Sequence, residues 1–193
     1  MDKPKFIAIL NSDCVQLEER EELLNAVLLN QDWIIILLKN MSDIQNKESY
    51  FSARTLELVC KQDLKLILPY LDKFYLLLPK IKLEGVVRSS AKIIELLTIN
   101  YFIKKDALYI EKINGKHLEQ FTESCFDWMI SDKSIAIQAH SMYALYLLGI
   151  KFDWIHIELA LIIEKGIPTG SIGYKNRGRK VLKAIETNTR LKL

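Results

Sequence analysis

Apolar residues recur along this chain at the three- and four-residue spacing of amphipathic helices. In VQLEEREELLNAVLL, Leu17, Leu24 and Leu28 fall on one side of a helix, and the acidic residues of its first half suit the helix dipole. The run QDWIIILLKN contains six consecutive apolar residues, which fit either a buried strand or a buried helix. We favour a helix, because the neighbouring segments are helical and Asp32 is suited to an N-cap.

The same periodicity predicts helices through the rest of the chain. The segments are YFSARTLELVC, LKLILPYLDKFYLLLPKI, VVRSSAKIIELLTINYFIKK, KHLEQFTESCFDWMI, KSIAIQAHSMYALYLLG, FDWIHIELALIIEKG and IGYKNRGRKVLKAIETN. Pro69 lies inside the second segment and should end a first turn or kink the helix. Residues 106–115 are predicted to form an irregular insertion. The chain has only 7 Gly and 4 Pro, and this scarcity of turn-forming residues also favours helix.

Four of these helices share a register of small and apolar residues. Aligning YFSARTLELVC, RSSAKIIELLT, AIQAHSMYALY and YKNRGRKVLKA places in one column Ala53, Ala91, Ala139 and Gly178. The column three places later contains Leu56, Ile94, Met142 and Val181. A small residue lets the second helix of a pair approach the first closely, and the residue one turn later fills the shared core. The spacings of 38, 48 and 39 residues, the longest of which includes the insertion, are typical of paired helices in an α-solenoid.

This pattern resembles HEAT-like repeats. The resemblance implies an all-α fold, an α-α superhelix (HEAT/ARM-like) with about four helix pairs over residues 31–190 plus an N-terminal helix, in a single domain of residues 1–193. A closer likeness covers nearly the whole chain, through LELVCKQDLKLILPYLDKF, CFDWMI, SMYALYLLG, FDWIHIEL and YKNRGRKVLK. These stretches are similar to a small family of bacterial helical proteins, some of which carry the label adenylosuccinate lyase.

The chain departs from the signature of true adenylosuccinate lyases, which are more than twice as long and close a Ser-Ser-x-Met-Pro-x-Lys-x-Asn loop over the substrate. Its one such pair, Ser89-Ser90, is followed by AKIIELL, without Met-Pro or Asn, in a segment predicted to be mid-helix. His117, His140 and His156 lie in no motif that resembles the general-acid histidine of that superfamily. We therefore expect no lyase activity and assign no catalytic residue.

Composition and cysteine spacing narrow the classes of protein further. Half of the chain is apolar and 26% is charged, as in ordinary globular proteins. Cys14, Cys60 and Cys125 are few and scattered, which suits a reducing compartment and gives no zinc-binding spacing. KFIAIL is too short for a signal peptide, and no apolar run approaches the roughly 20 residues that span a bilayer. We expect a cytoplasmic protein without a membrane segment, metal or cofactor.

Positive charge is concentrated near the end of the sequence. The net charge is +3, but residues 171–193 alone carry +6, from seven basic residues and the single acid Glu186. Lys175, Arg179 and Lys183 are spaced four apart and form one helical stripe, which Arg177 and Lys180 would extend. The favoured interpretation is the polar outer face of a terminal repeat. Binding of nucleic-acid phosphates and binding of an acidic protein are the alternatives.

Every tryptophan in the chain follows an aspartate. The pairs are Asp32-Trp33, Asp127-Trp128 and Asp153-Trp154. Such a pair would serve as a general acid beside an indole, or would stack a flipped base as in HEAT-like DNA glycosylases. We favour a structural interpretation for Asp32 and Asp153, in which each caps a helix that its tryptophan anchors in the core. Asp127 is predicted near a helix end, where a cap does not explain it.

The sequence therefore favours a non-catalytic binding or scaffold module of HEAT-like type, with a protein as partner. Contact would run along the face built by the second helices of the pairs. The candidate contact residues are Arg88, Lys175, Arg179 and Lys183. The alternative is a nucleic-acid-binding protein related to HEAT-like DNA glycosylases, and the third hypothesis is the lyase.

Overall fold

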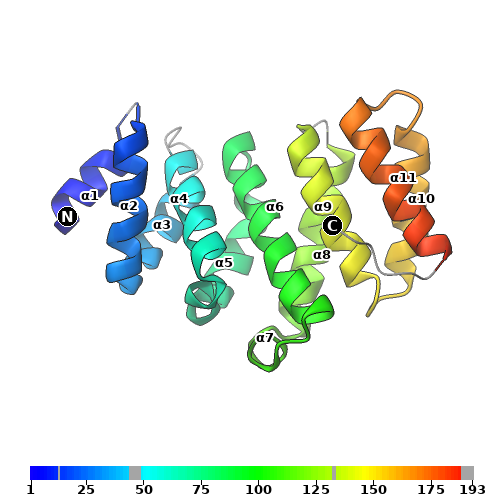
Figure 1. Cartoon of the computed structure of the whole chain (residues 1–193), viewed down its shortest axis with the longest axis horizontal. Coiled ribbons are helices and arrows are strands. Elements are labelled where there is room, and N and C mark those ends of the chain that lie inside the picture. The colour runs from blue at the N-terminus through cyan, green and yellow to red at the C-terminus, as the bar shows by residue number, and fades with distance from the viewer. Residues whose placement is uncertain (13, 44–48, 132–133, 188–193) are drawn as a thin grey trace. The chain divides into compact units, whose positions relative to one another are not determined.

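The structure is a computed structural model that describes residues 1–12, 14–43, 49–131 and 134–187, and every regular element in these ranges is helical (Figure 1). The α-helices are α1 (Lys3–Leu10), α2 (Leu17–Leu29), α3 (Ile34–Met41), α4 (Ser49–Gln62), α5 (Leu71–Leu77), α6 (Glu84–Thr98), α7 (Ala107–Lys112), α8 (Gly115–Ile130), α9 (Ile135–Leu148), α10 (Trp154–Gly166) and α11 (Ile172–Glu186). The remaining helical segments are the 3-10 helices η1 (Gln31–Trp33), η2 (Leu64–Tyr70) and η3 (Leu78–Lys80), and the π-helix η4 (Ile99–Ile103). The chain forms two compact units, Met1–Leu96 and Leu97–Leu193.

The apolar run after Asp32 is helical, as its neighbours predicted, but it begins differently. Asp32 lies inside η1, and α3 starts after Trp33 without a side-chain cap. The expectation that Asp32 caps this helix is therefore wrong. Instead, its carboxylate accepts a hydrogen bond of 3.3 Å from the Tyr70 hydroxyl, which links two segments far apart in sequence.

Two other local expectations have different outcomes. Pro69 does interrupt its segment, because the chain is a 3-10 helix (η2) around it and becomes the α-helix α5 only two residues later. Residues 106–115, expected to be irregular, instead contain the helix α7. Asp106 caps α7 by accepting a hydrogen bond of 3.0 Å from the Leu108 backbone N–H. A six-residue helix with one cap is too short for its periodicity to be recognised in sequence.

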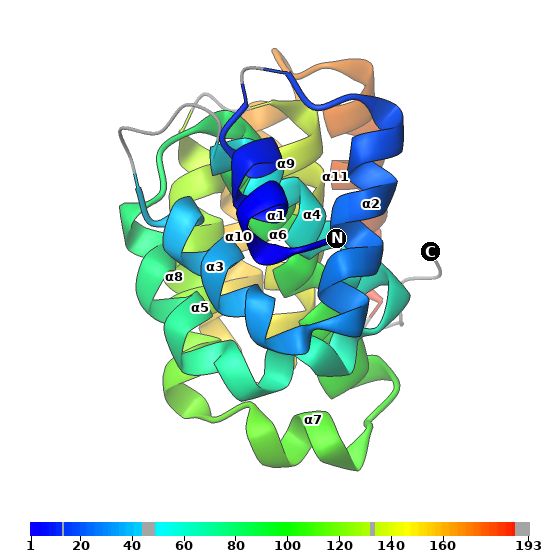
Figure 2. The ribbon, with the colours of Figure 1, turned by 90° about the vertical axis from the view of Figure 1, so that its left-hand side faces the viewer.

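The N-terminal unit is built in two layers. Helices α2, α4 and α6 lie side by side in one layer, and α3 and α5 form the other (Figures 1 and 2). Two helices, α1 and α2, precede residue 31, where the sequence predicted one. Helix α1 contacts α2 and α4 through buried residues that include Phe6 and Leu10. Ala53 and Leu56 of α4, with Ala91 and Ile94 of α6, are fully buried, as the register of small and apolar residues predicted.

The C-terminal unit repeats the two-layer plan. Helix α9 packs against α8, α10 and α11, and α10 also packs against α11. Met142 and Val181 are fully buried and Gly178 is buried, whereas Ala139 is only half-buried. Helices α3/α4, α8/α9 and α10/α11 are thus paired as expected within each unit. A HEAT/ARM-like superhelix and a single domain over residues 1–193 stay predictions. None of the described helices is both long and apolar enough to span a bilayer.

The close approach of α11 to α10 depends on Gly178. A Cβ atom placed there would lie 2.7 Å from Ile163 Cγ2, whereas one at Gly115, the first residue of α8, would meet nothing within 4 Å. We expect Gly178→Leu to lower the free energy of unfolding by about 1–3 kcal/mol through overpacking. Gly115→Leu, which makes the same side-chain change in an open position, should leave it nearly unchanged. Urea unfolding followed by circular dichroism measures both, and equal stabilities would contradict this packing.

Candidate functional site: an arginine-lined pocket in the N-terminal unit

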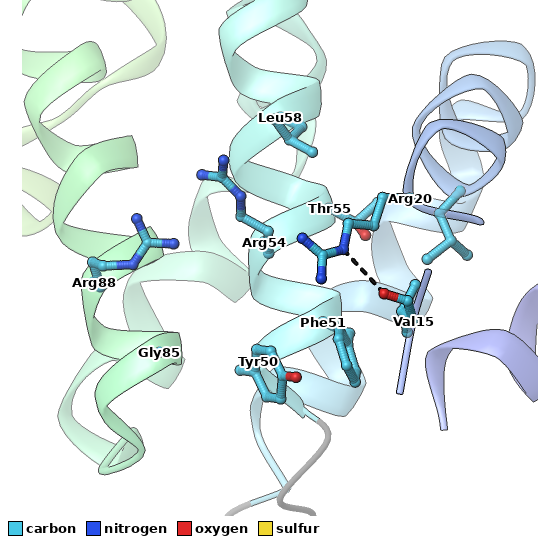
Figure 3. A pocket seen from close by; sticks show the side chains of 10 residues that line it. Val15, Arg20, Tyr50, Phe51, Arg54, Thr55, Leu58, Gly85 and Arg88 are labelled. Carbon is cyan, nitrogen blue, oxygen red and sulfur yellow. Dashed lines mark hydrogen bonds between the residues drawn. The ribbon is translucent and has the colours of Figure 1, made fainter. Parts of the chain in front are cut away.

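A pocket of about 150 Å³ lies in the N-terminal unit, where α2, α4 and α6 line up (Figure 3). Its polar lining is dominated by three arginines, one from each helix: Arg20, Arg54 and Arg88. Its other walls are mainly apolar or aromatic and include Val15, Leu23, Tyr50, Phe51 and Leu58. Among the residues that the structure describes, no cysteine, histidine or carboxylate lines it. The described part of the lining thus contains groups that bind an anion, without the usual nucleophiles and general bases.

Each arginine is placed by the helix that carries it. In Figure 3, Arg20 extends from α2 toward α4, and Arg88 extends from α6 toward α4 from the other side. Arg20 is held where its Nε donates a hydrogen bond of 3.1 Å to the Val15 carbonyl oxygen, which leaves its terminal nitrogens available. Gly85 lets α6 pass close to the pocket, because a Cβ there would lie 2.9 Å from Tyr50 Cβ.

The carboxylate of Glu57 organises the arginines from inside the protein. Glu57 belongs to α4 and is only 1% exposed. Its Oε1 lies 2.7 Å from Arg54 Nη1 and 2.6 Å from Lys61 Nζ. Its Oε2 accepts a hydrogen bond of 2.9 Å from the Ser89 hydroxyl of α6 and lies 3.6 Å from Arg88 Nη2. One buried carboxylate therefore joins α4 to α6 and orients two of the pocket's arginines.

The charges around Glu57 do not balance. Burial alone would raise the pKa of the Glu57 carboxyl, but hydrogen bonds from Lys61, Arg54 and Ser89 outweigh it and lower the pKa to about 2. Glu57 is therefore a carboxylate at neutral pH, and its single negative charge faces the positive charges of Arg54, Lys61 and Arg88. No ion pair of Arg20 occurs among the residues that the structure describes. The pocket thus carries a surplus of positive charge that a bound anion would neutralise.

Cys60, on the same helix, does not add chemistry to this site. Its side chain is buried, as expected, and burial raises the pKa of its thiol well above the usual range, with the negative charges of Glu57 and Asp63 acting in the same direction. A thiol in that state is a poor nucleophile at neutral pH. Cys60 therefore supplies no reactive thiol beside the pocket.

The predicted contact residues fall in both units. Arg88 lines the pocket, whereas Lys175, Arg179 and Lys183 lie on α11 of the C-terminal unit. There Arg179 and Lys183 are exposed and Lys175 is half-buried. The guanidinium of Arg177, expected to extend the stripe, is 5.4 Å from the centre of the Tyr143 ring, so a cation–π contact within the unit engages it.

Sequence reasoning missed Arg20, Arg54 and Glu57, although a signal for Arg54 was present. Counted from the small-residue column, Arg54 stands one place after Ala53 and Arg88 stands three places before Ala91. These two positions are four residues apart in the register and therefore share a helix face. Comparing that face between successive helices would have brought Arg54 and Arg88 together.

The Asp-Trp pairs do not form a common site. Trp128 is only 5% exposed, while Asp127 beside it faces solvent, so the two side chains are not directed into one groove. Trp154, expected in the core, is 53% exposed and stacks on Phe126, and that expectation is wrong. Asp153 occupies the N-cap position of α10 without making a side-chain cap bond. Trp33 is half-buried against Phe6 of α1.

The serines and histidines that the sequence analysis compared with the lyase signature are buried or make contacts within the fold. Ser89 and Ser90 are buried in the middle of α6, as expected from the absence of a loop pattern. The His117 ring takes part in the cap of α8, where its Nδ1 accepts a hydrogen bond from the Asn114 N–H. The His156 ring lies 2.8 Å from the Tyr146 carbonyl oxygen. Within the described ranges, no three histidine, cysteine or acidic side chains are grouped as a metal site.

Comparisons with known proteins give the chain no relatives. No family model, curated protein or solved structure matches it significantly. The resemblances to HEAT-like repeats and to the lyase-labelled family therefore stay predictions, and a functional hypothesis depends on the site itself.

The depressed pKa of Glu57 predicts a specific loss of stability in acid. We expect Glu57→Gln to lower the free energy of unfolding at pH 7 by about 3 kcal/mol. The substitution removes the negative charge that pairs with Arg54 and Lys61 and leaves these two cations without their counter-ion. The Glu57 contribution is fully present above its unfolded pKa of 4.5 and is lost as pH falls toward the folded value of about 2. Urea unfolding of both proteins from pH 7 to pH 2 should show the difference between them shrinking over that interval.

Glu22→Gln is the matched control for this experiment. Glu22 also forms an ion pair, 2.9 Å from Lys5 Nζ, but both side chains are exposed. Solvent screens such a pair, so its loss should leave stability unchanged. A wild-type and Glu57→Gln difference that does not change with pH would contradict the role assigned to the buried carboxylate.

Proposed function

We propose that the protein is a non-catalytic binding module that recognises an acidic segment of a partner protein through the arginine-lined pocket. The observation that supports this is the convergence of Arg20, Arg54 and Arg88 on one pocket whose neighbouring carboxylate, Glu57, is buried and already paired. Guanidinium groups bind carboxylates through paired N–H donors, and such charge-assisted bonds are stronger than neutral ones.

The size of the pocket favours one side chain over a whole small molecule. Its volume of about 150 Å³ is below the roughly 300–1,000 Å³ of typical small-molecule and cofactor sites. A glutamate or aspartate side chain of a partner would enter it and reach the arginines. The rest of the partner segment would lie over Tyr50 and Leu58 at its edge. A protein ligand extends beyond the pocket, and the layer formed by α2, α4 and α6 offers the adjoining surface.

Nucleic acid is the second candidate, and α11 provides the observation in its favour. Arg179 and Lys183 are exposed on the same side of α11, where phosphates would reach them. Binding of this kind would be largely independent of sequence and would weaken steeply with salt. The two candidates use different residues, so substitutions distinguish them.

Binding of a labelled acidic peptide tests the proposal. We expect fluorescein-labelled hexaglutamate to bind the full chain in a fluorescence-polarisation titration at low salt. Arg88→Ala and Arg20→Ala should each weaken this binding about tenfold, the effect of removing one hydrogen bond to a charged group. Arg179→Ala, which removes an exposed arginine from the other unit, is the matched control and should bind as the wild type does.

The same titration with labelled single- and double-stranded DNA and RNA, at two salt concentrations, separates the candidates. Nucleic-acid binding that depends on Arg179 and Lys183, with no binding of hexaglutamate, would favour the second candidate. Peptide binding that Arg88→Ala and Arg20→Ala leave unchanged would exclude the pocket as the recognition site.

A further inference from the structure

A second cavity of the N-terminal unit lies in its other layer, between α3 and α5. Its volume is about 380 Å³. Apolar side chains from both helices line it, and two of them, Ile35 and Leu76, are exposed. The polar part of the described lining consists of Lys39 of α3, Ser42 at the C-cap of α3, Lys73 of α5 and Lys80 of η3. We call this feature the lysine groove; none of its described lining residues belongs to the arginine-lined pocket.

The lysine groove combines apolar surface with unbalanced positive charge. Within the described ranges, no acidic residue lines it and none of its three lysines takes part in an ion pair. A solvent-exposed leucine is ordinary when single. Here, however, Leu76 is 55% exposed and shares one hollow with the exposed Ile35 of the facing helix. An occupant that covers both residues would gain from their burial and from pairing with the lysines.

The dimensions of the lysine groove match a short stretch of helix. Helix α3 has eight residues and α5 has seven, so each wall is about 10–12 Å long at 1.5 Å per residue. Two turns of a bound helix cover that length. Such a helix would present apolar residues at positions i, i+3 or i+4 and i+7, as in other helix-in-groove complexes. Lysines on both walls place the complementary acids on both sides of that apolar stripe.

We propose that the lysine groove binds an amphipathic helix of a partner protein, with an apolar stripe flanked by acidic residues. This site is separate from the one in the proposed function and depends on neither Arg20 nor Arg88. The hollow of about 380 Å³ that Ile35 and Leu76 line favours a helix, which would project into it, over a flat membrane surface. The lysine charges then determine which amphipathic helices bind, since a basic helix would be repelled.

A designed peptide tests the proposal on the full chain. The probe is a fluorescein-labelled peptide of roughly 15 residues, with leucines at i, i+3, i+4 and i+7 and glutamates on both flanks. A scrambled peptide of the same composition lacks the stripe, and a third peptide replaces the glutamates with lysines. Because the glutamates of either acidic probe would also enter the arginine-lined pocket, the titrations contain saturating unlabelled hexaglutamate. Under that condition we expect saturable binding of the first peptide only. Leu76→Glu should weaken it at least tenfold and Lys73→Glu about fivefold, the latter less at high salt.

The C-terminal unit offers a matched control. Leu161 on α10 is 56% exposed, almost the same as Leu76, so Leu161→Glu changes surface charge and apolarity equally outside the groove. It should bind the peptide as the wild type does. Because Leu76 and Lys73 are exposed, both groove variants should remain folded, which circular dichroism checks.

Several outcomes would overturn the proposal. Equal binding of the scrambled peptide would show charge attraction without a groove, and equal weakening by Leu161→Glu would place the peptide elsewhere. Absence of saturable binding to the wild type would exclude this class of ligand. Tighter binding to phosphatidylserine vesicles that Leu76→Glu abolishes would make the occupant a membrane. Self-association in sedimentation velocity that Leu76→Glu abolishes would make it a second copy of the chain.

Discussion

The N-terminal unit depends on the need to neutralise one buried charge. A carboxylate removed from water carries a large desolvation cost unless cations and hydrogen-bond donors surround it. Glu57 meets that condition with Arg54 and Lys61 on its own helix and with Ser89 and Arg88 on α6. These contacts fix the side-by-side placement of α4 and α6. Glu57 holds Arg54 and Arg88 on their inner side, and the pocket opens beside them.

The register of small and apolar residues was a reliable guide to the core because it reports a close approach of two helices. All four residues of its apolar column, Leu56 among them, are fully buried. A leucine-rich segment with apolar residues on more than one side is harder to interpret. In α2 the buried residues are Leu23, Ala26 and Val27, whereas Leu17, which the sequence assigned to the apolar face, is exposed. Only the neighbouring helices decide which of two apolar faces is covered.

The candidate site could not be predicted as a whole, because its residues meet only in three dimensions. Arg88 was identified from its sequence position, but Arg20 lies in a helix outside the repeat register, and nothing local brings it to the pocket. Glu57 reads as an ordinary surface acid, with Arg54 and Lys61 at helical spacing. Its burial, and hence its depressed pKa, arises from the packing of α6. Trp154 is the opposite case, a residue typical of cores that the fold leaves on the surface.

Summed charge does not indicate where the two basic cavities lie, and the reason bears on the kind of partner that we propose. Residues 1–96 contain thirteen basic and fourteen acidic residues, so their net charge is −1, whereas residues 97–193 carry +4. Yet both basic cavities lie in the first range, where none of the described residues that line them is acidic, although four acids flank Arg20 in the first half of α2. A surface of this kind attracts a polyanion weakly at long range and an acidic group strongly at close range, since neighbouring acids cancel the distant field. Nucleic acids are recruited chiefly through that distant field. A short acidic segment of a protein that fits each cavity by shape depends far less on the long-range field. The charge distribution therefore agrees with the protein partners that we propose for these two sites.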